Sequence, residues 1–171
     1  MTWDTLVDGL RAYGVRYLSG GAEAMEQAPG ELPDPLWLLC SLARSLEPRL
    51  RQATVALFLI HPELAEAARR AAASLDGQSR RHLVEAYVAA VYLQRMWRTR
   101  LRRYLGEQPL LPPHWTQELG LPDPDERFGK VGLATLAARS GHGPRAPLGP
   151  YEKVARLLFG QLRAERAAAA A

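Results

Sequence analysis

The longest stretch without a helix breaker runs from about Ser79 to Leu105 and reads SRRHLVEAYVAAVYLQRMWRTRLRRYL. Neither proline nor glycine interrupts it, so the pattern predicts one helix of ~27 residues, about 40 Å long at 1.5 Å per residue. Ser79 is the expected N-cap, and Gly106 stands where a C-cap glycine belongs. Other helices must cover the apolar surface of such a helix, so we expect it to be the central element of the fold.

Two stripes of side chains follow this helix at helical spacing. One stripe is apolar from end to end, whereas the other begins with valines and continues with arginines. The first half of the helix should therefore be buried on two sides, and the second half should leave the core with a basic face. The apolar stripe comprises Leu83, Tyr87, Ala90, Trp97, Leu101 and Leu105, and the mixed stripe comprises Val84, Val88, Val91, Arg95, Arg98 and Arg102.

The basic half of this helix is the candidate binding surface. One interpretation is structural, because the helix dipole favours cations near the C-terminus by about 0.3–1 kcal/mol each and acids elsewhere can pair with them. The other is functional, because guanidinium groups match phosphate geometry, and an acidic protein would also fit. Trp97 and Tyr104 could stack on bases, although both fall on or beside the apolar stripe. The candidate binding residues are Arg95, Arg98, Arg100, Arg102 and Arg103.

Composition limits how much the arginines alone can prove. Of the 22 basic residues, only Lys130 and Lys153 are lysines, Ile60 is the sole isoleucine, and asparagine is absent. Codons for these three residue types are AT-rich, so a GC-rich bacterial genome accounts for the bias. The net charge of +4 permits nucleic-acid binding but does not require it.

Prolines and glycines divide the rest of the chain into shorter helices. The expected fold is one all-α domain over residues 1–171: an irregular bundle of about six or seven helices around the long central helix, with one short extended segment near Val15. The breaks also resemble those of HEAT-like repeats, but no regular period supports a solenoid. Helical spacing places Leu46 and Phe128 on apolar faces. The expected regions are a helix plus loop (1–33, with the loop over 19–34), a four-helix core (34–105), Pro/Gly-rich connectors with one helix starting near Asp123 (106–150, with a loop over 140–150) and a C-terminal helix (151–171).

The start of the chain resembles the opening of bacterial minimal nucleotidyltransferases. The resemblance consists of a short helix, the segment GVRYL at 14–18 and a glycine pair at 20–21. That family then places two metal-binding carboxylates on a strand. The nearest acids here are Glu31 and Asp34, and Pro33 between them is incompatible with a strand in a ladder. The resemblance covers about 20 of the 171 residues and does not include the catalytic acids, so it predicts no nucleotidyl transfer.

The sequence contains no recognisable catalytic or metal-binding motif, and we predict neither a metal nor a cofactor. The histidines have no metal-ligand spacing, and HExxH and CxxC are absent. Cys40 is the single cysteine, so no intramolecular disulfide can form and a reduced cytoplasmic location is expected. We expect no membrane association, because the N-terminus lacks a signal-peptide pattern and the longest apolar run is far shorter than the ~20 residues of a spanning helix. The histidines are His61, His82, His114 and His142.

The leading functional hypothesis is a non-enzymatic interaction protein, an adaptor or a subunit of a larger bacterial assembly, with another protein or a second copy as its partner. The alternative is a helical nucleic-acid-binding protein that uses the arginine-rich helix face. A third is an enzyme without a recognisable motif. The hypotheses differ in what they require: arginines paired internally favour the adaptor, an open groove favours nucleic acid, and a deep pocket with a perturbed ionisable group favours an enzyme.

Overall fold

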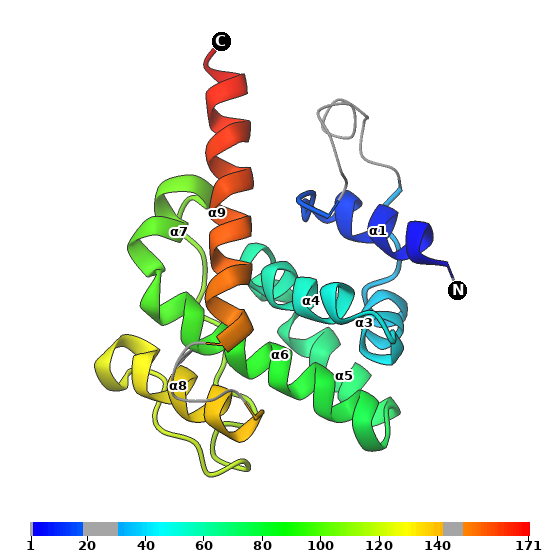
Figure 1. Ribbon diagram of the computed structural model, residues 1–171, viewed down its shortest axis with the longest axis vertical. Coiled ribbons are helices and arrows are strands. Elements are labelled where there is room, and N and C mark those ends of the chain that lie inside the picture. Colours follow the sequence, from blue (N-terminus) through cyan, green and yellow to red (C-terminus); the bar gives the residue numbers. More distant parts are fainter. Residues whose placement is uncertain (1, 19–30, 142–148) are drawn as a thin grey trace.

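The computed structural model describes residues 2–18, 31–141 and 149–171, and over these ranges the chain is all-helical (Figure 1). The all-α prediction is confirmed. The described residues form the α-helices α1 (Trp3–Ala12), α3 (Pro35–Arg44), α4 (Pro48–Ile60), α5 (Ala65–Ser74), α6 (Gly77–Met96), α7 (Arg98–Leu105), α8 (Lys130–Arg139) and α9 (Gly149–Ala169), and the 3₁₀-helices η1 (Pro62–Leu64) and η2 (Glu126–Gly129).

The single helix predicted over residues 79–105 is wrong, because α6 and α7 are separate helices that meet at Trp97. The backbone of Trp97 has φ −112° and ψ 19°, outside the helical range, although neither proline nor glycine stands there. α7 instead turns to lie along α9 (Figure 1). There, the rings of Trp97 and Tyr104 lie 5.8 and 6.3 Å from that of Phe159, measured between centroids. Contact with another helix therefore overrides the local preference for a continuous one.

Local signals set most of the other helix ends. Asp34 caps α3, because its carboxylate accepts a hydrogen bond from the Trp37 N–H at 2.7 Å. Gly106, with φ 78°, ends α7 as predicted. The predicted N-cap Ser79 is wrong, because α6 already begins at Gly77.

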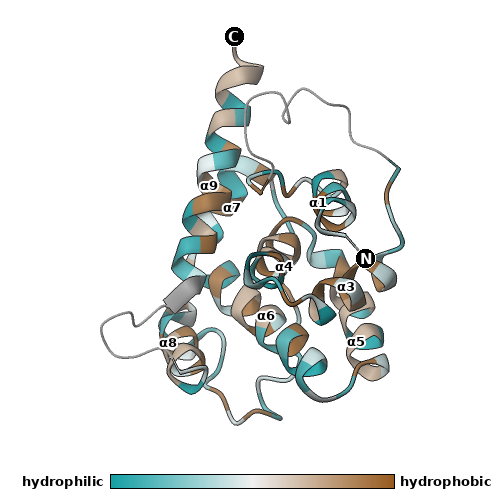
Figure 2. Cartoon of the chain, turned by 45° about the vertical axis from the view of Figure 1, so that its right-hand side comes forward, coloured by the Kyte–Doolittle hydropathy of each residue, from teal (hydrophilic) through white to brown (hydrophobic). Residues whose placement is uncertain are grey.

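The core is built on two helices, α4 and α6, that pack against each other. α4 is buried on every side from Ala53 to Leu59, because it also packs against α3 and α9. On α6, the rings of Tyr87 and Tyr92 are fully buried. Figure 2 shows apolar residues on α4 and on the neighbouring helices that enclose it. The predicted bundle around a long helix is thus confirmed, with α4 as a second buried helix beside the 20-residue α6.

α9 packs against α4 and α7 and then extends past the other helices (Figure 1). Phe159 is buried at this junction. Two residues further along α9, the Gln161 side-chain oxygen accepts hydrogen bonds from the main-chain N–H groups of Arg16 and Tyr17, at 2.8 and 3.1 Å. The segment after α1 is thereby fastened to α9. This part of the described chain forms no strand, in contrast to the extended segment expected near Val15.

Two apolar residues that helical spacing placed in the core lie outside it. Leu46 is 91% exposed, because α3 ends at Arg44. Phe128 is 78% exposed, because the helix expected to start near Asp123 begins only at Lys130. In both cases the apolar pattern continues beyond the helix itself, so the spacing rule no longer applies.

Some predicted features fall outside the described residues. These are most of the loop expected over 19–34, with the glycine pair at 20–21, and most of the loop expected over 140–150, with His142.

A candidate anion-binding groove

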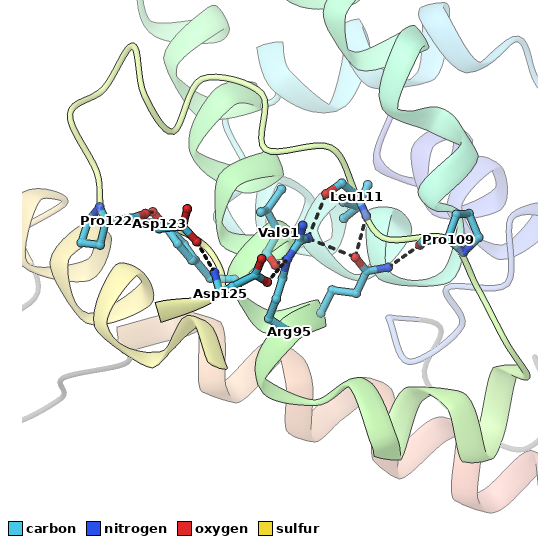
Figure 3. Close-up of polar contacts among 9 residues, drawn as sticks. Val91, Arg95, Pro109, Leu111, Pro122, Asp123 and Asp125 are labelled. Carbon is cyan, nitrogen blue, oxygen red and sulfur yellow. Dashed lines mark hydrogen bonds and ion pairs between the residues drawn. The ribbon is translucent and has the colours of Figure 1, made fainter. Parts of the chain in front are cut away.

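Arg95, the first of the five candidate arginines, points into the molecule. Its side chain is 9% exposed, and its Nη1 donates hydrogen bonds to the main-chain oxygens of Val91 and Leu111 at 3.3 and 2.8 Å. Oδ1 of Asp125 lies 3.6 Å from Nε (Figure 3). Burial lowers the pKa of Arg95, and the carboxylate of Asp125 opposes that shift. Arg95 therefore holds the connector that follows α7 against α6.

Gln94, beside Arg95, fastens the same connector with both ends of its amide. Its oxygen accepts a hydrogen bond from the Leu111 N–H at 2.7 Å, and its nitrogen donates to the Pro109 carbonyl at 2.9 Å. Gln94 is 3% exposed, so these bonds replace those it would make to water. The polar end of α6 is thus used for internal structure.

Two buried tyrosines of α6 continue this arrangement. The hydroxyls of Tyr87 and Tyr92 donate hydrogen bonds to the carbonyls of Pro112 and Pro122, at 2.9 and 2.7 Å. Burial raises the pKa of Tyr92 to about 12 and also raises that of Tyr87 above its ordinary value. Both hydroxyls therefore stay protonated at neutral pH and act as hydrogen-bond donors.

Two glycines allow the start of α8 to approach α6 at Tyr92. A Cβ at Gly132 would lie 2.0 Å from the nearest atom of the Tyr92 ring, and one at Gly129 would lie 2.4 Å from the Tyr92 carbonyl oxygen. Gly129 also has φ 80°, in the left-handed region. Only glycine satisfies both conditions there, so the position of this turn is fixed by contact with α6.

The turn before Gly129 is strained and exposes an aromatic ring. Arg127 and Phe128 have φ values of 45° and 57°, also in the left-handed region, which costs an L-residue about 1–2 kcal/mol each. Phe128 gains little burial in return, since it is 78% exposed. Strained backbone of this kind clusters at active sites and ligand-binding sites.

Three of the candidate arginines, Arg98, Arg100 and Arg103, are exposed on α7 and have no ionic partner in the described residues. None of them takes part in an ion pair or in a side-chain hydrogen bond within that part of the chain. Arg102 differs, because its Nε lies 3.7 Å from a carboxylate oxygen of Glu107. The five candidates therefore divide into one buried residue, one in a surface ion pair and three that are exposed and form no ion pair in the described residues.

Arg100 is oriented although it is not paired. Its guanidinium carbon lies 4.2 Å from the centroid of the Phe159 ring and 5.9 Å from that of Trp97. Stacking holds the planar group by one face and leaves its N–H edge available for an anion. The aromatic contacts that turn α7 onto α9 therefore also orient one of its cations.

These side chains line a groove of about 780 Å³ at the junction of α6, α7 and the strained turn. We call it the α7 groove. Its lining combines cations with aromatic rings and includes no carboxylate. The lining residues are Arg95, Met96, Trp97, Arg98, Thr99, Arg100, Arg103, Tyr104 and Phe128.

Other basic residues that could have extended this surface lie elsewhere. Arg80 and Arg81 are at the start of α6, about 22 Å from its end along the helix axis. Arg80 lies 3.4 Å from a carboxylate oxygen of Glu118. Neither of these two residues therefore extends the α7 groove.

His61 and Cys40 have structural surroundings in the described residues. His61 is held by Glu63 and by the Tyr13 carbonyl, at 2.6 and 2.8 Å. Cys40 is buried, and no group of three or more His, Cys, Asp or Glu residues within the described ranges could hold a metal. No helix in those ranges has the length and apolar character needed to cross a membrane.

Sequence reasoning identified the three free arginines but missed Phe128. Helical spacing placed this residue in the core, whereas the turn places it in the groove. A signal for the turn was present in the two glycines that follow, Gly129 and Gly132, which are poor helix formers at a predicted helix start.

Comparison with protein family models, curated proteins and solved structures found no match. Fold and groove therefore define the class by themselves: an all-helical protein with an open groove of cations and aromatic rings.

Proposed function

We propose that this chain is a non-enzymatic interaction protein that binds an anionic partner in the α7 groove. The observation that carries the proposal is the presence of three exposed, unpaired arginines around one cavity, while every other member of the candidate set is used internally or paired. Arginines that are exposed only because they lie on a solvated surface would not be expected to line one cavity. Three that converge on one provide a site for negative charge.

Codon bias is the competing explanation, and a matched variant separates the two. Arg49, Arg70 and Arg81 are also exposed, form no ion pair in the described residues and do not line the groove. Changing either set of three to glutamine lowers the net charge equally. If base composition alone supplied the arginines, both variants would lose affinity for polyanions to the same extent. If the α7 groove is the binding site, only the variant that changes Arg98, Arg100 and Arg103 should lose affinity.

The test is fluorescence anisotropy with labelled polyglutamate, single-stranded DNA and duplex DNA between about 50 and 200 mM salt. We expect the wild type to bind at least one of them with an affinity that falls as salt rises. R98Q/R100Q/R103Q should lose that binding, and R49Q/R70Q/R81Q should retain it. Absence of binding by the wild type at the lowest salt, or equal loss in both variants, would overturn the proposal.

A second surface favours contact with a protein. Leu46 is 91% exposed beside a cavity of about 490 Å³ that Trp3 and Leu50 also line. Exposed leucine and tryptophan next to a cavity are typical of protein contacts. An adaptor role with a protein partner or a second copy would use this surface. Light scattering tests the second copy: association that L46E abolishes would support it, and a monomer at high concentration would contradict it.

A further inference from the structure

We infer that the anion bound in the α7 groove is single-stranded nucleic acid. In this arrangement, Phe128 stacks on a base while Arg98, Arg100 and Arg103 contact phosphates. The inference rests on the proposed function, because it names the chemical class of the anionic partner at that same groove. It adds a requirement that charge alone does not impose, since it assigns a role to the exposed ring.

Phe128 lines the α7 groove together with Arg98, Arg100 and Arg103. A purely ionic partner needs cations, and an exposed phenyl ring beside them contributes nothing to it. A nucleotide offers both a phosphate and a flat aromatic base, and base–aromatic stacking is the usual way in which single strands are held in basic grooves. The ring is also held in place from one side, since it stands in a strained turn whose far end, Gly129, is fixed against Tyr92.

The exposed ring of Phe128 also distinguishes a single strand from a duplex. In a duplex the bases stack on one another and present only their edges in the grooves. The face of Phe128 can stack only on a base that is unpaired, so the groove favours a single strand over a duplex. Arg100 fits the same chemistry, because its stacked guanidinium offers a free N–H edge to a phosphate.

The spacing of the arginines along α7 corresponds to about two nucleotides. Five residues separate Arg98 from Arg103, which corresponds to about 7.5 Å along α7 at 1.5 Å per residue. That distance is about the rise of two stacked nucleotides at 3.4 Å each. The groove thus has cations for two or three phosphates and one ring for one base, and it carries no hydrogen-bond pattern that would select a sequence.

The experiment measures anisotropy with a labelled oligonucleotide of about 15 nucleotides, supplied as DNA and as RNA. Three further probes are an oligonucleotide of the same length that lacks bases, a hairpin duplex, and polyglutamate. The variants are F128A, F128W and R98Q/R100Q/R103Q. L32A serves as the matched control, because Leu32 is an exposed apolar residue outside the groove. Circular dichroism verifies that each variant is folded.

We expect F128A to lower the affinity for the single strand by about 5- to 150-fold and F128W to restore it. F128A should leave the salt dependence unchanged, whereas the arginine variant should reduce its slope by about 0.7 for each phosphate that is no longer neutralised. The oligonucleotide without bases should bind weakly to the wild type and equally weakly to F128A. L32A should behave as the wild type.

Failure of the inference differs from failure of the proposed function. Wild-type affinity of F128A for the single strand, tighter binding of the duplex, or tighter binding of polyglutamate would each overturn the single-strand inference while leaving an anion-binding groove in place. In the last case the partner is an acidic protein. If no probe binds, both the inference and the proposed function fail.

Discussion

Arg95 and Arg98 are three residues apart, yet they belong to different parts of the protein. Arg95 is at the end of α6, where the Arg95 guanidinium, the Gln94 amide nitrogen and the Tyr92 hydroxyl each donate a hydrogen bond to a main-chain oxygen of the connector. Arg98 begins α7, where the arginines at the groove are exposed and unpaired in the described residues. The break at Trp97 separates the two. The comparison teaches that an arginine cluster in sequence is not a surface until the backbone between its members is known.

The largest effect should come from the contact that holds the strained turn against α6. Gly129→Ala places a Cβ against the Tyr92 carbonyl and requires a left-handed alanine, so we expect the free energy of unfolding in urea to fall by about 3–5 kcal/mol. Gly160→Ala is the matched control. It lies on α9 with open space around it, and it should raise stability by up to about 1 kcal/mol. Equal effects at both positions would refute the close contact.

The next effect tests the comparison directly. Arg95→Ala removes the donors to the carbonyls of Val91 and Leu111, so we expect a loss of about 2–4 kcal/mol in the free energy of unfolding. Arg98→Ala should change it by less than about 0.5 kcal/mol. For the binding of polyanions we expect the opposite order. Arg98→Ala should bind more weakly than Arg95→Ala when the two variants are compared at equal concentrations of folded protein. A similar loss of stability in both variants would mean that α6 and α7 do not differ as described.

Phe128→Gly should raise the stability while it removes the proposed stacking ring. Glycine relieves the left-handed strain, which outweighs the added freedom of the unfolded chain, so we expect a gain of about 0.5–1 kcal/mol in urea unfolding. Affinity for the single strand should fall at the same time. A loss of stability would show instead that the Phe128 side chain contributes to the packing of the turn.

The smallest effect we expect is a pH dependence of the free energy of unfolding that comes from His114, beside α6. Burial and the nearby charge of Arg69 lower the pKa of His114 below its ordinary 6.5, although Glu66 opposes the shift, and the ring stacks on Tyr87. A lowered folded-state pKa means that His114 binds more protons in the unfolded chain than in the folded one. Stability is therefore fully present above pH 6.5 and falls as the pH drops from there toward the folded-state pKa. His114→Gln should flatten this part of the stability profile, and an unchanged profile would contradict the assignment.

Much of the fold followed from the sequence, and the physical reason is that its signals are local. Asp34 forms its predicted cap, and Gly106 ends α7 because a positive φ suits glycine. The candidate site followed only in part. Exposure of Arg98, Arg100 and Arg103 was consistent with helical spacing, whereas spacing alone placed Arg95 on one stripe with Arg98 and Arg102.

The sequence by itself determined the all-helical class, most of the helix breaks and the arginine-rich segment, because these depend on backbone preferences within a few residues. Only the tertiary structure decided which arginines are exposed at the α7 groove and which aromatic ring stands beside them. Phe159 turns α7 at Trp97, and Tyr92 admits only glycine at the turn that exposes Phe128. Each of these contacts joins residues about 30 or more positions apart, which no local pattern encodes.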